Sequence, residues 1–309
     1  MDERAKTLSA GSGAPGLRHL DPAVVARLST LELKARAIVE GFITGLHRSP
    51  FRGFSVEFAE YRPYLPGDDL AGLDWKVYAR SDRHFVKKFE EETNVECHLL
   101  VDVSRSMQYG TGAMTKREYA QTLAACLAYL MQRQRDAAGL MAFDNDIVRR
   151  VPPGTRPGHL RMLLAELDRL PDGRESDLSK PLERLAAVLV RRGIIVLISD
   201  LLDEPARVIR GLELLRARGS EVVVFQVLDR AELTFPFENA TQFKDLETGA
   251  EVLTRPADVR EAYLASFDAM LRAYAEAFGA AGIEYVRLDT HEPLDRALSA
   301  WLTARARRR

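Results

Sequence analysis

Three oxygen-bearing side chains stand at alternate positions directly after an apolar run. Residues 99–101 are Leu-Leu-Val, which predicts a buried parallel strand, and Asp102, Ser104 and Ser106 follow it. Open α/β sheets place ligands at the carboxyl ends of their strands, and side chains two apart on extended backbone point the same way. One carboxylate and two hydroxyls can therefore converge, and these hard oxygens suit Mg²⁺ or Mn²⁺ rather than zinc.

A second carboxylate follows a second buried strand. Residues 194–198 are Ile-Ile-Val-Leu-Ile, and Asp200 comes just after them. If the two strands are neighbours, Asp200 lies close to Asp102, and two adjacent carboxylates repel unless a cation lies between them. Ser176, which precedes a predicted helix, offers a third hydroxyl. Each residue alone is typical of a helix cap or a turn, so the prediction of a metal site rests on their combination.

The elements that position these residues alternate between strand and helix from residue 95 onward. Continuous Val, Ile and Leu runs separated by helical patterns predict an α/β fold with a doubly wound, mostly parallel sheet. A hairpin insertion is expected near residues 235–255, with its turn at 247–249. The predicted helices span 114–135, 159–170, 179–191, 205–218, 258–281 and 293–306, and the other predicted strands span 138–143, 147–151, 222–227 and 283–288.

The first part of the chain differs in character. Residues 1–20 contain Gly, Ser and Ala without periodicity and are predicted to be disordered. Apolar residues at three- and four-residue spacing after Asp21 predict one amphipathic helix that ends near Gly41 or Gly45. Alternating aromatic and charged residues predict half-buried strands at 54–58 and 85–90. We therefore divide the chain into a disordered N-terminus (1–20), an N-terminal helix with a β-rich module (21–94) and an α/β domain (95–309).

Composition narrows the environment and the partners. Lys and Arg number 44 against 45 Asp and Glu, so overall charge gives no reason to expect nucleic acid as a partner. No apolar segment approaches the ~20 residues that span a bilayer, so any membrane association is expected to be indirect. Cys97 and Cys126 have no metal or redox spacing and are expected to be reduced, buried thiols in a cytoplasmic protein. The Arg-rich end at 305–309 is expected to complement the dipole of the last helix.

The residues of the predicted metal site resemble a known motif. Asp102, Ser104 and Ser106 form D-x-S-x-S, which with Ser176 and Asp200 resembles the metal-ion-dependent adhesion site of von Willebrand factor type A domains. Further stretches resemble the family called domain of unknown function 58. They are Phe-Arg-Gly-Phe at 51–54, Tyr-Arg-Pro-Tyr-Leu-Pro-Gly-Asp-Asp at 61–69 and Asp-Trp-Lys-Val-Tyr-Ala-Arg at 74–80. The likeness runs from about residue 31 to residue 229.

The resemblance implies a von Willebrand factor type A-like fold and a role for each site residue. It implies that Ser104 and Ser106 ligate Mg²⁺ directly, that Asp102 and Asp200 act mainly through water, and that a carboxylate of a partner completes the shell. Ser176 stands where the family usually has threonine, so it keeps the hydroxyl without the methyl group. Members of the family are commonly associated with MoxR-type AAA+ ATPases, in systems proposed to assemble other proteins or to insert metals into them. The resemblance therefore implies a non-catalytic adaptor that binds such an ATPase, its client protein, or both.

A second group of residues precedes the metal motif. Trp75, Lys76, Tyr78 and Arg80 combine aromatic and basic side chains. Such a group is typical both of a docking surface for a partner protein and of the core of a small β-module with solvated charges. We retain both interpretations, with partner binding as the functional one.

An enzymatic alternative uses the same aspartate. A metal-dependent phosphohydrolase of the haloacid dehalogenase type also begins with an Asp after a buried strand, but it needs a second Asp two residues later, where this chain has Ser104. Residues 110–116 superficially suggest a phosphate-binding loop, yet Thr115 occupies the position of the glycine that precedes the lysine. The six histidines show no metal-ligand spacing. The sequence therefore favours a binding protein over a hydrolase that uses Asp102.

Overall fold

The computed structural model describes most of the chain from residue 95 onward and three shorter segments before it. The described residues are 20–45, 61–63, 85–87, 95–173, 178–188, 192–239, 241–246 and 250–308. Ser176, the possible docking residues Trp75, Lys76, Tyr78 and Arg80, the predicted strand at 54–58 and residues 1–19 of the predicted disordered N-terminus lie outside them.

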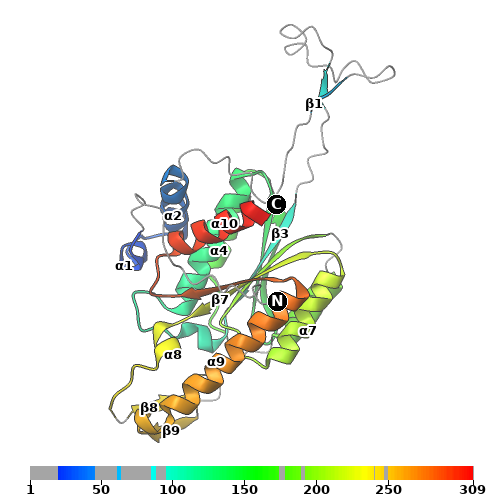
Figure 1. Ribbon diagram of the computed structural model, residues 1–309. Coiled ribbons are helices and arrows are strands. Elements are labelled where there is room, and N and C mark those ends of the chain that lie inside the picture. The colour runs from blue at the N-terminus through cyan, green and yellow to red at the C-terminus, as the bar shows by residue number, and fades with distance from the viewer. Residues whose placement is uncertain are drawn as a thin grey trace.

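A six-stranded sheet forms the centre of the molecule (Figure 1). Its spatial order is β10-β7-β6-β3-β4-β5, and every neighbouring pair is parallel except β4 with β5. Numbered by chain order within the sheet, this is the 3-2-1-4-5-6 order of doubly wound folds, with an antiparallel strand at one edge. The strands are β3 (Glu96–Asp102), β4 (Ala137–Phe143), β5 (Ile147–Gly154), β6 (Gly193–Ser199), β7 (Glu221–Leu228) and β10 (Glu284–Asp289).

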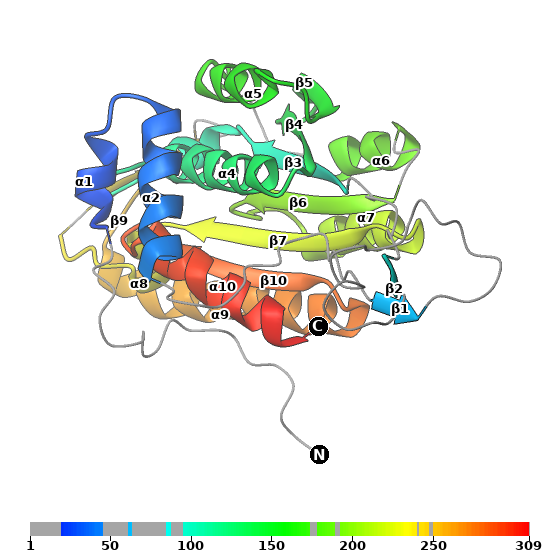
Figure 2. The same ribbon diagram turned by 90° about the horizontal axis from the view of Figure 1, so that it is seen from above.

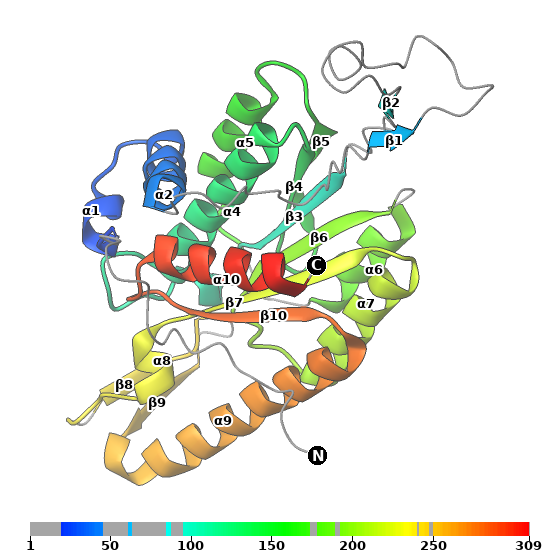
Figure 3. The same cartoon turned by 45° about the horizontal axis from the view of Figure 1, so that its top comes forward.

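Helices cover both faces of this sheet (Figures 2 and 3). Side chains of α2, α4, α5 and α10 form the core on one face, and those of α6, α7 and α9 form the core on the other. The doubly wound, mostly parallel sheet predicted from the apolar runs is therefore confirmed. The helices are α2 (Leu31–Gly45), α4 (Lys116–Arg133), α5 (His159–Asp168), α6 (Ser179–Val188), α7 (Pro205–Ala217), α9 (Pro256–Ala281) and α10 (Leu294–Arg308).

The strand that ends at the metal motif shows why its sequence is continuously apolar. Leu99 and Val101 belong to the core beneath α4, whereas Leu100 belongs to the core on the opposite face. Because side chains alternate across a strand, a central strand covered on both faces needs apolar residues at every position. This packing fixes the end of β3, and with it the position of Asp102.

The predicted single N-terminal helix is wrong, because the structure contains two. Asp21 caps α1 (Pro22–Ala26) by accepting a hydrogen bond from the Ala23 amide at 2.8 Å. The chain then turns, and the Thr30 hydroxyl accepts the Leu33 amide at 3.2 Å, so α2 begins anew. A side-chain oxygen that satisfies the first amides of a helix favours a separate start. α2 buries part of its apolar face in the same core as α4.

Two small antiparallel pairs accompany the main sheet. β1 (Tyr61–Pro63) pairs with β2 (Phe85–Lys87), which lies within the strand predicted at 85–90, whereas β1 was not predicted. β8 (Thr241–Lys244) pairs with β9 (Glu251–Thr254), so the predicted hairpin insertion is confirmed, although its turn lies outside the described residues. A short helix, α8 (Arg230–Thr234), precedes the hairpin. Among the helices of the described residues, none has the length and apolarity to cross a membrane.

Candidate metal centre

Asp102 and Asp200 lie at the same edge of the sheet, at the point where the strand order reverses. Asp102 is the last residue of β3, Asp200 directly follows β6, and these two strands are parallel neighbours in which Val101 pairs with Ile198. In doubly wound sheets this switch point is where ligands bind. The two residues are 0% and 2% exposed. The sequence thus delivers two buried carboxylates to one place in the fold.

Hydrogen bonds hold the Asp102 carboxylate in a fixed orientation. Its Oδ1 accepts the Ser104 amide at 2.8 Å, and its Oδ2 accepts the Ser199 hydroxyl at 2.6 Å. Burial and the neighbouring charge of Asp200 raise the pKa of Asp102 to about 7, against the opposing effect of the bonds from Ser199 and Ser104. The site therefore favours a positive charge close to this carboxylate.

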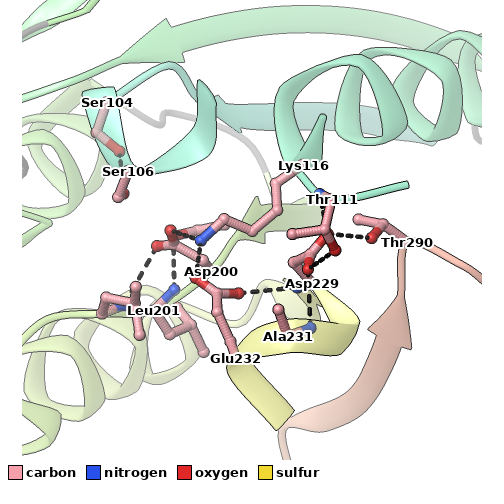
Figure 4. Close-up of polar contacts among 12 residues, drawn as sticks. Ser104, Ser106, Thr111, Lys116, Asp200, Leu201, Asp229, Ala231, Glu232 and Thr290 are labelled. Atoms are coloured by element: carbon pink, nitrogen blue, oxygen red, sulfur yellow. Dashed lines mark hydrogen bonds and ion pairs between the residues drawn. The ribbon is translucent and has the colours of Figure 1, made fainter. Parts of the chain in front are cut away.

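The two serines of the motif lie side by side beyond Asp102. Ser104 precedes a short 3₁₀ helix (Arg105–Gln108), and its Oγ lies 3.0 Å from the Oγ of Ser106 (Figure 4). Two oxygens on adjacent corners of a Mg²⁺ octahedron, each about 2.1 Å from the ion, lie about 3.0 Å apart. Ser104 is buried and Ser106 is half-buried. The hydroxyl pair therefore has the spacing of two neighbouring ligands.

The loop after β6 holds Asp200 through backbone contacts. Leu201 is buried with a φ of +55°, a conformation that costs a non-glycine residue about 1 kcal/mol or more and persists only where the surroundings hold it. The Leu201 amide donates to the Ser199 hydroxyl at 3.0 Å, and its carbonyl accepts the Tyr274 hydroxyl at 3.1 Å. The Leu202 amide donates to Asp200 Oδ1 at 3.3 Å. This geometry fixes the carboxylate at the edge of the site.

A buried lysine, which the sequence analysis did not identify, lies between two of the carboxylates. Lys116 Nζ donates to Asp200 Oδ2 at 2.8 Å and to Glu232 Oε1 at 2.5 Å, and its side chain is 0% exposed (Figure 4). Burial alone lowers the pKa of the Lys116 ammonium, but Asp200 and Glu232 outweigh it and place that pKa above its ordinary value. Lys116 is therefore a charged ammonium inside the protein.

The four ionisable groups of the site carry an excess of negative charge. When Asp102, Asp200 and Glu232 are ionised, the cluster holds three carboxylates and one ammonium, which pairs with Asp200 and Glu232, so its formal net charge is −2. Uncompensated charge in a protein interior is unfavourable, and one divalent cation would balance it. The charge and the oxygen donors of the site thus fit Mg²⁺ or Mn²⁺. Among the described residues there is no group of three or more His, Cys, Asp or Glu side chains arranged to hold a metal ion, so a metal at this centre would need the serine hydroxyls as ligands.

Asp229 forms a second polar centre next to this cluster. It follows β7 and accepts bonds from the Thr111 amide and hydroxyl at 2.8 and 2.5 Å, from the Ala231 amide at 2.8 Å and from the Thr290 hydroxyl at 3.1 Å. Burial alone raises the pKa of Asp229, but these donors outweigh it and lower the pKa below its ordinary value. Asp229 also caps α8, and its own amide donates to the Glu232 carboxylate of that helix at 2.8 Å. It therefore connects three loops around the site.

The described residues on either side of Ser176, which are Gly173 and Leu178, contact loops of the site. The Gly173 amide donates to the Val103 carbonyl at 3.0 Å, and a Cβ at Gly173 would lie only 2.0 Å from that carbonyl oxygen, so only glycine permits this approach. On the other side of Ser176, the Leu178 amide donates to Asp203 at 3.0 Å. The structure thus brings together Asp102, Ser104, Ser106 and Asp200, while Ser176 stays a prediction.

Lys116, Asp229 and Glu232 were not predicted as site residues, and the sequence contains only weak patterns that point to them. Lys116 lies three and seven residues before Tyr119 and Leu123, so helical spacing places it on the buried face of α4. Asp229 and Glu232 have the spacing of a capping box. These patterns indicate burial and a helix start, but they do not show that the residues meet Asp200.

Comparison with known proteins identifies the family of this doubly wound α/β domain. Residues 60–270 match the family described as protein of unknown function DUF58, and the chain belongs to this family. Uncharacterized protein Rv1480 of Mycobacterium tuberculosis and uncharacterized protein Mb1516 of Mycobacterium bovis are each 32% identical over 232 residues, which cover 74% of this chain and 73% of each relative. The resemblance to the DUF58 family is confirmed.

Solved structures with similar folds share less sequence. BatB from Bacteroides thetaiotaomicron is 17% identical with a TM-score of 0.49, over 69% of this chain and 99% of BatB. The VWA domain of SpRpn10 is 12% identical with a TM-score of 0.42, over 67% of this chain and 94% of that domain. The fold assignment rests on the strand order of the sheet itself.

Proposed function

We propose that this protein is a metal-dependent protein-binding adaptor whose site at the switch point holds Mg²⁺ or Mn²⁺. The observation that carries the proposal is the pair of serine hydroxyls, 3.0 Å apart, beside buried carboxylates that leave a formal net charge of −2. Ser104 and Ser106 would be direct ligands. Asp102 and Asp200 would act through water, as the family resemblance implies, and the hydrogen bonds to both oxygens of each carboxylate would hold them in place.

The bound ion would supply positive charge for recognition of a partner. Mg²⁺ takes six oxygens, and two neutral hydroxyls reduce its charge very little. A carboxylate from another protein could therefore replace a bound water with a charge-assisted contact that a neutral amide could not match. Ser106 is half-buried at the site, and Arg105 and Leu202 next to the two motifs are exposed. An acidic side chain with apolar neighbours suits this surface.

The family resemblance supplies the class of partner. A MoxR-type AAA+ ATPase, or the client protein on which it acts, would present the Asp or Glu that completes the coordination shell. Ser176 is a further possible hydroxyl ligand, and Trp75, Lys76, Tyr78 and Arg80 form a possible second contact. Alanine variants of Ser176 and of these four residues, all of which lie outside the described residues, test these roles.

The geometry does not favour the hydrolase alternative. A nucleophilic aspartate must reach its substrate, but Asp102 is 0% exposed and both of its oxygens accept hydrogen bonds. Ser104, at the position that a second catalytic aspartate would need, donates its amide to Asp102. We therefore assign binding rather than catalysis to this site.

The proposal is tested by calorimetry followed by a binding assay. Mn²⁺ should bind the wild-type protein at one site, and Ser104→Ala should lower the affinity at least tenfold because a direct ligand is lost. Ser299→Ala is the matched control, since its hydroxyl only bonds to the Arg296 carbonyl within α10. A purified MoxR-type ATPase should then bind in Mn²⁺ and be released by EDTA. Equal Mn²⁺ affinity in wild type and Ser104→Ala would overturn the metal site, and association unaffected by EDTA would overturn the shared-ion mechanism.

A further inference from the structure

The ammonium of Lys116 is the one positive charge found in direct contact with the carboxylates of the candidate metal centre in the part of the chain that the structure describes. Lys116 is the first residue of α4 and lies on the face that packs against the sheet. Its two ion pairs join Asp200, after β6, to Glu232 of α8. Its Nζ also lies 5.9 Å from the centre of the Tyr109 ring. A lysine buried so deeply is retained only with partners of this kind.

The ion pair places an ammonium directly on the Asp200 carboxylate. Asp200 Oδ2 accepts from Lys116 at 2.8 Å, while its Oδ1 accepts the Leu202 amide at 3.3 Å. Each carboxylate oxygen keeps a further lone pair, but a metal ion that ligated Oδ2 would lie next to the Lys116 ammonium, and repulsion between the two cations disfavours direct ligation there. The neutral hydroxyls of Ser104 and Ser106 bond to each other, and the Ser104 side chain also bonds to Asp102. The ammonium beside Asp200 therefore favours the serine hydroxyls over the Asp200 carboxylate for direct ligation.

We infer that Lys116 is a positioning residue that holds Asp200 out of the ion's inner shell and keeps the charge of the centre at −2 instead of −3. The inference rests on the proposed function. A divalent ion then neutralises the cluster without being enclosed by carboxylates, and it keeps coordination positions for a partner. Without Lys116, the additional negative charge would attract the ion more strongly, and Asp200 would be free to ligate it.

A substitution at Glu232 changes the charge of the centre in the direction opposite to a substitution at Lys116. Glu232→Gln keeps the size of the side chain but lowers the negative charge beside Lys116, so the centre changes from −2 to −1. Lys116→Met changes it from −2 to −3. The double variant Lys116→Met with Glu232→Gln restores −2 while removing the ion pairs. These three variants separate the effect of charge from the effect of structure.

The test is Mn²⁺ affinity, measured by calorimetry at fixed ionic strength. Lys116→Met should bind Mn²⁺ about tenfold more tightly than wild type, Glu232→Gln severalfold more weakly, and the double variant within about threefold of wild type. Glu276→Gln, the same substitution at an exposed residue of α9, is the control and should bind as wild type does. A purely structural lysine predicts weaker binding in Lys116→Met and in the double variant, and that result would overturn the inference.

Folding of the variants is measured alongside. Removing Lys116 leaves two carboxylates without their cation, so a lower melting temperature is expected in EDTA, with a larger increase on adding Mn²⁺ than in wild type. If Lys116→Met does not fold, the Mn²⁺ affinities of Glu232→Gln and of the double variant test the inference instead. An unchanged Mn²⁺ affinity in Glu232→Gln would overturn it. A wild-type protein that binds no Mn²⁺ would overturn the proposed function as well. If the wild type binds Mn²⁺ but the Mn²⁺ affinities of the variants do not follow the expected order, only this inference is overturned.

Discussion

Replacing Asp102 by asparagine should stabilise the metal-free protein, although it should weaken the metal site. The Asp102 carboxylate is fully buried next to Asp200, so its charge is unfavourable without a cation. Asparagine has nearly the same shape, and its carbonyl oxygen can still accept the Ser104 amide that now bonds to Oδ1. The substitution therefore removes repulsion while it keeps the packing.

The size of the effect follows from the pKa of Asp102. Burial and Asp200 raise this pKa from 3.8 to about 7, so the folded protein binds the proton more tightly than the unfolded chain does. The free energy of unfolding of the metal-free wild type should therefore fall as the pH rises from about 4 to about 7, and level off above that. At about 1.4 kcal/mol per pKa unit, a rise of this kind corresponds to a cost on the order of several kcal/mol at pH 8. Because asparagine carries no charge, the free energy of unfolding of Asp102→Asn should not fall with pH for this reason.

Urea unfolding in EDTA at pH 5 and pH 8 measures the difference. Asp102→Asn should exceed the wild type by several kcal/mol at pH 8 and by less at pH 5. Mn²⁺ at 100 times its dissociation constant should then stabilise the wild type by about 2.7 kcal/mol and the variant by much less, so that the gap narrows. Asp268→Asn, at an exposed position of α9, is the control. A wild type at least as stable as Asp102→Asn in EDTA at pH 8 would refute the reasoning.

Three other substitutions or assays probe the surroundings of the site. Asp229→Asn should lower stability by about 1–3 kcal/mol at pH 7, because a carboxylate that accepts four hydrogen bonds is lost. Because the pKa of Asp229 is lowered in the folded protein, the stability difference between wild type and Asp229→Asn should shrink as the pH falls through that lowered pKa. Chemical unfolding at several pH values measures this difference. A difference that does not change with pH would contradict the prediction. Arg305→Met should lower the free energy of unfolding, measured in urea, by about 2–3 kcal/mol, because Glu221 and Glu284 lose their shared cation. The control Arg272→Met, at an exposed ion pair of α9, should change the free energy of unfolding little. Equal losses in the two variants would count against this explanation. With Mn²⁺, the protein should not hydrolyse p-nitrophenyl phosphate, and turnover that disappears in Asp102→Asn would favour the hydrolase.

Arg305 also shows how a tertiary contact changes the meaning of a local pattern. The basic residues at the end of the chain were interpreted as partners of the helix dipole. The structure shows Arg305 8% exposed, paired with Glu221 at 2.5 Å and Glu284 at 2.7 Å, and 5.7 Å from the centre of the Trp301 ring. These partners begin β7 and β10, which are distant in sequence. Arg305 therefore links α10 to β7 and β10 of the sheet through these ion pairs.

The central sheet could be predicted because burial on both faces leaves a continuous apolar signal. The strands β3, β6 and β7 are such runs, and their carboxyl ends place polar residues at one edge. The register of neighbouring strands is decided by packing across the sheet, so the sequence could indicate that Asp102 and Asp200 are close, but not how they are held. The break between α1 and α2 was missed because a single hydroxyl, that of Thr30, starts the second helix.

The charge of the candidate centre could not be predicted from the motif, because it depends on residues that meet only in the folded protein. Lys116 is 84 residues from Asp200 and 116 from Glu232 in the chain, and both contacts require α4, the end of β6 and α8 to be in place. The motif by itself suggests carboxylates that repel and need an ion to offset their full charge. The folded protein already contains one cation among them. Metal binding therefore has to be explained by the charge that remains after this internal pairing, and the affinity for the ion should follow substitutions at Lys116 and Glu232 as closely as substitutions at the ligands.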